Sequence, residues 1–221
     1  MYGKILLIGL AGSFINLDEH TAVQSMICRP IAAGPLIGLL LGDVRTGIIV
    51  GIILELLLFR TLPVGVSMPI NFSMVTILAT GLILVISELM NITADTSLIM
   101  FVLFFTIPTG LIFKEVEVMN RKFNIELVHK AEEKIIQGKL NYVEIITYLS
   151  ILIAFAKNFI YISLSMIIGL LILPWAYLRM PARVLKSFDE LFVLIISLGF
   201  AIAIGTFGVV YGKKARKINT D

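Results

Sequence analysis

A stretch of apolar runs broken by helix-disrupting residues, 29–71, places the strongest constraint on what this chain can fold into. It contains glycine-rich and proline-rich pieces, the turn at Gly42, and a lone carboxylate, Glu55, among leucines and isoleucines. Backbone left unpaired in hydrocarbon is costly, so irregular segments persist there only where protein or a water-filled cavity surrounds them. The pattern therefore predicts discontinuous helices and polar groups inside a membrane.

Composition supports a membrane chain. Of the 221 residues, 58% are hydrophobic and 15% are charged, whereas soluble domains are about 45–50% apolar. The single cysteine, Cys28, excludes an internal disulfide, and we expect it only to pack. The first 16 residues are apolar but are followed by no small-residue cleavage site, so we expect structure there rather than a signal peptide.

Several apolar segments are too short to cross a bilayer, which takes roughly 20 helical residues. Segments of 12 or 13 residues fit half-helices or re-entrant hairpins better. We predict an all-α, polytopic membrane protein with short, broken or re-entrant helices. The expected apolar segments are 5–16, 31–42, 47–59, 73–89, 98–113, 142–156, 159–173 and 190–211.

The one long polar stretch, 114–139, alternates basic and acidic residues. Its apolar side chains recur near helical spacing, which predicts an amphipathic helix at the membrane surface or between two membrane parts. We expect three parts: an N-terminal membrane region (1–113), an amphipathic linker (114–141) and a C-terminal membrane region (142–221). The apolar stripe of the linker consists of Val118, Phe123, Leu127, Ala131 and Ile135.

Basic residues predict the orientation of the chain. The net charge is +3, and the basic residues lie in blocks rather than along a face that could bind nucleic acid. The last block, 213–217, follows an apolar segment. By the positive-inside rule this places the C-terminus in the cytoplasm. Lys157 and Asn158 interrupt the apolar run 142–173, which could cross once as a broken helix or twice. The rule favours the single, broken crossing, because it keeps the basic residues of 114–139 inside.

Glycines recur every fourth residue on both sides of the turn. Four-residue spacing keeps a set on one helical face, and glycine there lets two helix backbones approach closely. The turn at 42–47 would join the two helices as a hairpin, and packing alone is the simpler explanation of the glycines. The two sets are Gly34, Gly38 and Gly42, then Gly47 and Gly51 with Glu55.

Glu55 is a candidate binding residue, because an unpaired carboxylate among leucines would be strongly disfavoured in a membrane. It needs a partner or a ligand. The alternative is that Glu55 reaches the interface and pairs with Arg60, four residues away. Arg29 could similarly anchor at lipid head groups, with Pro30 in the first turn of the next helix.

The segment from Pro63 to Asn71 is a second candidate for binding, since its prolines disfavour a regular helix and leave backbone carbonyls free. With Ser67 and Asn71 these groups supply neutral donors and acceptors, which suit an uncharged, hydroxyl-rich solute. An ordinary interfacial loop is the alternative. Asp18 and Gln24, in the polar interruption after the first apolar segment, are further candidates.

The sequence indicates no metal, cofactor or catalytic site. His20 and His129 stand apart from other ligands at metal-binding spacing. Neither a Walker loop, a Gly-x-Ser-x-Gly elbow nor a dinucleotide fingerprint occurs. We therefore expect that transport, if this chain supports it, is powered by another subunit or an ion gradient.

Five motifs together resemble a known family. The block reads Arg29-Pro30, Leu41-Gly42-Asp43-Val44-Arg45-Thr46-Gly47, Leu54-Glu55, Pro63-Val64-Gly65 and Pro69-Ile70-Asn71. Over residues 17–80 it is similar to the membrane subunit IIC of the mannose-type (mannose, fructose, sorbose) phosphoenolpyruvate-dependent sugar phosphotransferase system. Asn71 stands where that family often has aspartate.

The resemblance implies a sugar permease subunit that binds a hexose or related sugar while partner IIB phosphorylates it. It implies a hetero-oligomer with subunit IID in the bilayer of a bacterial cell membrane, and cytoplasmic IIA and IIB proteins that carry the phosphoryl histidines. This chain would then contribute sugar contacts but no phosphoryl-transfer residue. The implied contacts are Glu55 and Asn71, with Gln24, Asp18 and Ser67 as further candidates.

A different class of function stays open from the residues alone. The chain could be a non-catalytic substrate-capture subunit, as in an ATP-driven vitamin importer, or a degenerate receptor. Neighbouring genes would discriminate, since IIA, IIB and IID genes indicate the permease and an ATPase pair indicates the importer.

Overall fold

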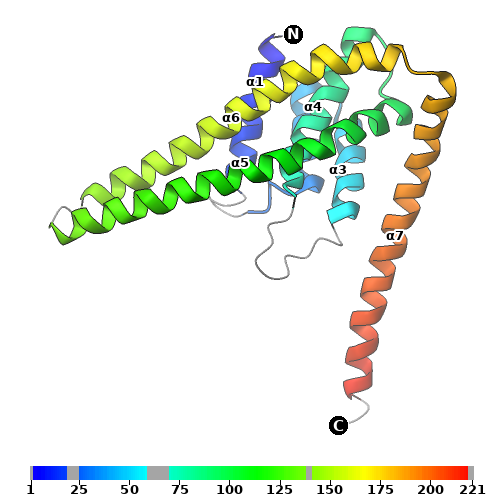
Figure 1. The fold of residues 1–221 in the computed structure, drawn as a ribbon. Coiled ribbons are helices and arrows are strands. Elements are labelled where there is room, and N and C mark those ends of the chain that lie inside the picture. Colours follow the sequence, from blue (N-terminus) through cyan, green and yellow to red (C-terminus); the bar gives the residue numbers. More distant parts are fainter. Residues whose placement is uncertain (1, 19–24, 59–69, 138–140, 219–221) are drawn as a thin grey trace.

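The computed structural model describes residues 2–18, 25–58, 70–137 and 141–218. In these ranges the chain is helical, without strands, as predicted. The helices are α1 (Tyr2–Leu17), α2 (Pro30–Leu41), α3 (Val44–Leu58), α4 (Phe72–Met90), α5 (Thr96–Ile136), α6 (Asn141–Leu178) and α7 (Ala182–Ile218). A bundle of shorter helices stands beside a long helical pair, and the last helix packs against α5 and α3 before it extends past the bundle (Figure 1).

Helix α4 is the central element of the bundle. It begins where the Asn71 side chain accepts a hydrogen bond from the Met74 amide at 2.8 Å, a typical N-cap. It ends at Asn91, whose left-handed backbone (φ 50°) closes the last turn onto Ser87 and Glu88 carbonyls. Helices α1, α2, α3, α5 and α6 all contact α4, so it is buried along most of its length.

Helices α2 and α3 form the glycine hairpin that the four-residue spacing predicted. A Cβ on Gly38 would lie 2.6 Å from the Asp43 carbonyl oxygen, and one on Gly51 would lie 2.5 Å from that of Pro30. Only glycine permits this approach of the two backbones. Gly42 turns the chain with φ 90°, and Asp43 then caps α3 by accepting the Thr46 amide at 3.1 Å.

Helix α1 runs antiparallel to α4 and also packs on α6. A Cβ on Gly12 would lie 2.6 Å from Ile77 of α4 and 2.9 Å from Ile162 of α6. Successive helices α1 to α4 therefore alternate in direction. The first residues of α2 and α4 consequently lie at the same end of the bundle (Figure 1).

Helices α5 and α6 are each continuous over at least twice the length of any bundle helix, and they extend past the bundle side by side (Figure 1). The expected break at Lys157 and Asn158 is wrong. Lys157 Nζ lies 3.7 Å from Glu117 Oε1 and 5.0 Å from the centroid of the Phe113 ring. Because α5 supplies a counter-charge and an aromatic face, the lysine is accommodated inside an uninterrupted helix.

The polar segment 114–136 is helical as expected, but it continues α5 rather than forming a separate linker helix. Leu127 and Ala131 of its apolar stripe are buried, whereas Phe123 and Ile135 are exposed. A helix already formed across 96–113 extends without a new nucleation step, and nothing in 114–136 is proline or glycine. The division of the chain into three parts stays a prediction.

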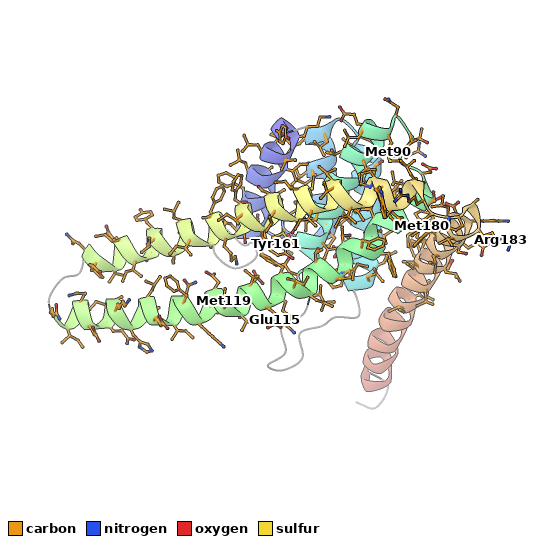
Figure 2. The ribbon with its side chains drawn as sticks, turned by 45° about the horizontal axis from the view of Figure 1, so that its top comes forward. Met90, Glu115, Met119, Tyr161, Met180 and Arg183 are labelled. Atoms are coloured by element: carbon orange, nitrogen blue, oxygen red, sulfur yellow. The ribbon has the colours of Figure 1, made fainter. Side chains whose placement is uncertain are left out.

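Aromatic and hydroxyl groups hold α6 and α7 on α5. In Figure 2 Tyr161 lies between α6 and α5, and its hydroxyl donates to the Thr109 carbonyl at 2.6 Å. Phe188 of α7 packs edge-on against Phe101 of α5, with ring centroids 5.9 Å apart. Three of the described helices, α4, α5 and α6, are long and apolar enough to cross a membrane.

Candidate functional site

Four polar residues gather at one end of the bundle, where α1 and α3 end and α2 and α4 begin. They are Asp18, Arg29, Glu55 and Asn71, and this region is called the site end below. The alternating direction of the first four helices brings the residues to the same end although 53 positions separate the first from the last. Gln24, Ser67 and Arg60, which the sequence also singled out, lie outside the described residues, as do Pro63 to Pro69.

Glu55 is buried with 9% of its surface exposed, and it has the partner that its position required. Its Oε1 forms an ion pair with the Arg29 guanidinium, and its Oε2 accepts the Ile31 amide at 3.3 Å. Ile31 lies in the first turn of α2, where the helix dipole also favours a negative charge. Arg29 is the N-cap residue of α2, but its side chain caps no amide of that helix. The Glu55 carboxylate, which comes from α3, caps the helix instead.

Arg29 is the residue of this end whose role the sequence did not indicate. Its guanidinium pairs with Glu55, because the hairpin brings the start of α2 against the end of α3. Its Nε is buried and has no hydrogen-bond partner among the described residues. A guanidinium holds its donors in a fixed plane, so the Nε–H group remains available to an incoming acceptor.

Asp18 is buried and binds the residues just before α2. Its carboxylate accepts hydrogen bonds from the Ser25 amide at 2.8 Å, the Ser25 hydroxyl at 2.9 Å and the Ile27 amide at 2.9 Å. The hydrogen bond from the Ser25 amide is the main cause that lowers the pKa of Asp18 below its ordinary value, while burial acts in the opposite direction. The group is therefore an ionised anchor for residues 25–27.

Asn71 lies at the beginning of α4 and beside α5. Its Oδ1 accepts the Met74 amide, and its carbonyl oxygen would lie 3.3 Å from a Cβ on Gly110. An aspartate at this position would cap the helix equally well. The neutral asparagine therefore changes the charge at the site end without changing the start of α4.

The donor set at the site end consists of carboxylate, guanidinium, amide and backbone groups. In the part of the chain that the structure describes, no three His, Cys, Asp or Glu side chains are placed to hold a metal ion. The chemistry that these residues offer is hydrogen bonding to a polar ligand.

The sequence model of the family described as the PTS system sorbose-specific IIC component matches residues 2–210. The chain belongs to this family. The match covers far more of the chain than the motif block over residues 17–80, and it confirms the resemblance to a mannose-type IIC subunit. The all-α fold with long apolar helices is accordingly that of a membrane protein.

Individual relatives of this IIC subunit agree with the assignment. One is an Escherichia coli (strain K12) protein provisionally named N-acetylgalactosamine permease IIC component 2, which is 36% identical over 74 residues. That match covers 34% of this chain and 55% of the relative, so the chain spans about half the length of the curated protein it matches.

Two solved structures share the fold of this IIC subunit. One, titled as the structure of a membrane protein, superposes with a TM-score of 0.73 at 19% identity over 94% of this chain and 80% of its own. The other is a complex of the mannose transporter ManYZ with microcin E492, with a TM-score of 0.55 at 21% identity over 92% of this chain and 77% of its own. At these identities the likeness concerns the fold alone.

Proposed function

We propose that the chain is the sugar-translocating IIC subunit of a phosphoenolpyruvate-dependent phosphotransferase system. The observation that carries the proposal is the buried Glu55 carboxylate, held by Arg29 and the first turn of α2 at the site end of a IIC-family bundle. A carboxylate fixed in this way accepts hydrogen bonds from two neighbouring hydroxyls, and the Arg29 Nε can donate to a ring or hydroxyl oxygen.

Glu55 and Arg29 would be the principal sugar contacts, with Asn71 completing the site from the start of α4. Asp18 already accepts three hydrogen bonds, so we propose that it positions residues 25–27 rather than touching the sugar. Gln24 and Ser67 lie outside the described residues and stay candidate contacts on the sequence alone. A neutral Asn71 in place of an aspartate would suit a ligand without positive charge.

The site end would face the cytoplasm. In Figure 1 the C-terminal end of α7 points in the same direction as the site end, and the basic residues that follow its apolar part favour the cytoplasm. A sugar released there would meet cytoplasmic IIB carrying phosphate from IIA. We place the protein in the bacterial inner membrane.

Subunit IID would complete the membrane complex. Helices α6 and α7 expose large apolar side chains that the described bundle leaves uncovered, and these can contact lipid or the helices of IID. On these two helices they include Leu164, Leu171, Trp175, Leu191, Leu194 and Leu198.

The test is phosphoenolpyruvate-dependent phosphorylation of hexoses and amino sugars by membrane vesicles that carry this chain with its IIA, IIB and IID partners. We expect one or a few sugars to be phosphorylated, and the product to disappear when this chain is omitted. Glu55→Gln keeps the size of the side chain but removes the charge that holds Arg29. We expect it to abolish sugar binding while the complex still assembles.

Glu115→Gln is the matched control. Glu115 is an exposed carboxylate on α5 (Figure 2), so its loss should leave phosphorylation unchanged. Normal sugar uptake by an assembled Glu55→Gln complex would refute the assignment of Glu55. Absence of product with every sugar, despite stable assembly, would refute the permease function.

A further inference from the structure

Helices α1, α4 and α6 pack in layers that repeat every four residues. In one layer Gly81 of α4 faces Ile8 of α1 and Met166 of α6, with a Cβ on Gly81 3.2 and 3.3 Å from them. In the next layer Gly12 of α1 faces Ile77 and Ile162. Each step adds four positions on α1 and subtracts four on α4 and α6, because α1 runs antiparallel to both.

The same step leads from Gly12, Ile77 and Ile162 to Asn16, Ser73 and Asn158. These three residues are called the polar layer below. Phe14 and Phe155, with ring centroids 4.9 Å apart, show that α1 and α6 remain in contact at this depth. At this step of the register the residues that face one another therefore change from apolar to polar.

The polar layer is buried and lacks partners. Asn16, Ser73 and Asn158 are 3%, 5% and 2% exposed. Asn16 Oδ1, Ser73 Oγ and Asn158 Oδ1 each have no hydrogen-bond partner among the described residues. Buried polar atoms are almost always hydrogen-bonded, and three such oxygens from three helices in one layer indicate a ligand.

The polar layer adjoins the site end. Asn16 precedes Asp18 by two residues on α1, and Ser73 follows Asn71 by two residues at the start of α4. Asn158 reaches the same layer from α6, a helix that contributes nothing else to the candidate site. A ligand bound at the site end and extending into the bundle would meet these oxygens next.

We propose that Asn16, Ser73 and Asn158 form the deep wall of the ligand site and accept hydrogen bonds from hydroxyl groups. The inference rests on the proposed sugar permease function and extends it to α6. All three groups are neutral oxygens and none of the three is a carboxylate, so a hydroxyl donor suits the layer better than a cation. The hydroxyls belong to the bound sugar, and an ordered water in their place is the alternative that the experiment distinguishes.

The experiment uses the full complex in vesicles and the sugar that the phosphorylation panel identifies. Dissociation constants are measured for this sugar and its monodeoxy analogues with wild type, Asn16→Leu and Asn158→Leu. We expect each variant to bind the sugar about five- to tenfold more weakly, the value of one hydrogen bond. Wild type should bind one deoxy analogue more weakly than the sugar itself. Each variant should bind this analogue and the sugar equally well.

Thr80→Val is the matched control. Thr80 of α4 is also fully buried with an unpartnered hydroxyl, but it lies outside the polar layer. Its replacement should leave the dissociation constant unchanged. If the leucine variants fail to assemble, Ser73→Ala replaces them as the smallest change in the polar layer. It should also weaken sugar binding.

The outcomes separate this inference from the proposed function. If wild type phosphorylates no sugar, the permease function fails. If wild type phosphorylates a sugar but the assembled layer variants bind it as wild type does, the function stands and the polar layer inference is overturned. Unchanged sugar binding together with a lower melting temperature of the layer variants would assign the layer to ordered water and overturn the sugar contact.

Discussion

Helices α4 and α6 are almost equally apolar, yet they occupy opposite environments. In the most apolar 18 residues, 83% of α4 is buried inside the protein, against 17% of α6. Helix α4 contacts five other helices, whereas α6 lies on one side of the bundle against α1, α4 and α5. Hydropathy measures how compatible a helix is with an apolar environment, and both lipid and a protein interior are such environments. Side-chain packing decides which of the two a helix faces.

The largest expected difference between the two helices comes from truncating a leucine on each of them. Leu78 of α4 is fully buried and Leu171 of α6 is 78% exposed. Leu78→Ala leaves a cavity and should lower the free energy of unfolding by about 2–5 kcal/mol. Leu171→Ala should lower it by far less, because lipid or detergent fills the space. Equal losses in unfolding measurements on the two purified variants would contradict the assignment of α6 to the surface.

A second test concerns what holds α6 to α5. Removing one member of the Glu117–Lys157 pair leaves the other charge poorly compensated. Glu117→Gln should destabilise the protein by about 1.5–3 kcal/mol, less than for a fully buried pair. A double-mutant cycle with Lys157→Met, measured by thermal unfolding, should recover part of this loss. Strict additivity of the two substitutions would show that the pair does not couple the helices.

A third test compares two glycines. A Cβ on Gly34 would collide with the Gly47 carbonyl across the α2–α3 hairpin, whereas one on Gly3 would meet nothing within 4 Å. Gly34→Ala should therefore cost about 1–3 kcal/mol through forced separation of the backbones. Gly3→Ala should be neutral or slightly stabilising, since alanine favours helix. The same melting shift in both variants would argue against close hairpin packing.

The smallest expected effect lies at the turn between α2 and α3. The Thr46 hydroxyl is the main cause that lowers the pKa of Asp43 below its ordinary value. A lowered folded-state pKa stabilises the protein above the ordinary pKa, and this stabilisation is lost as the pH falls through the lowered value. Thr46→Val should cost about 0.5–1.5 kcal/mol at neutral pH, and the difference from wild type should shrink in acid. A difference that is independent of pH would contradict this role of Thr46.

Parts of the site could be predicted from local sequence because they depend on local physics. The lone carboxylate Glu55 was recognisable as needing a partner, and the spacing of Gly34, Gly47 and Gly51 predicted the close hairpin. The partner itself, Arg29, was missed, because 26 positions separate it from Glu55 and only the hairpin brings them together. Asn16 carried no signal, and Asn158 was recognised only as part of an interruption of an apolar run, which by itself does not indicate a buried polar contact.

The sequence by itself determined that the chain is helical, belongs in a membrane, and is a IIC subunit, because composition, helical periodicity and motif order are properties of the linear chain. The continuity of α5 and α6, the central position of α4 and the pairing of Glu55 with Arg29 became visible in the folded chain alone. The physical reason is that hydrocarbon and protein interior accept the same apolar side chains. Which helices meet is then decided by shape, charge pairing and the register of contacts between distant residues.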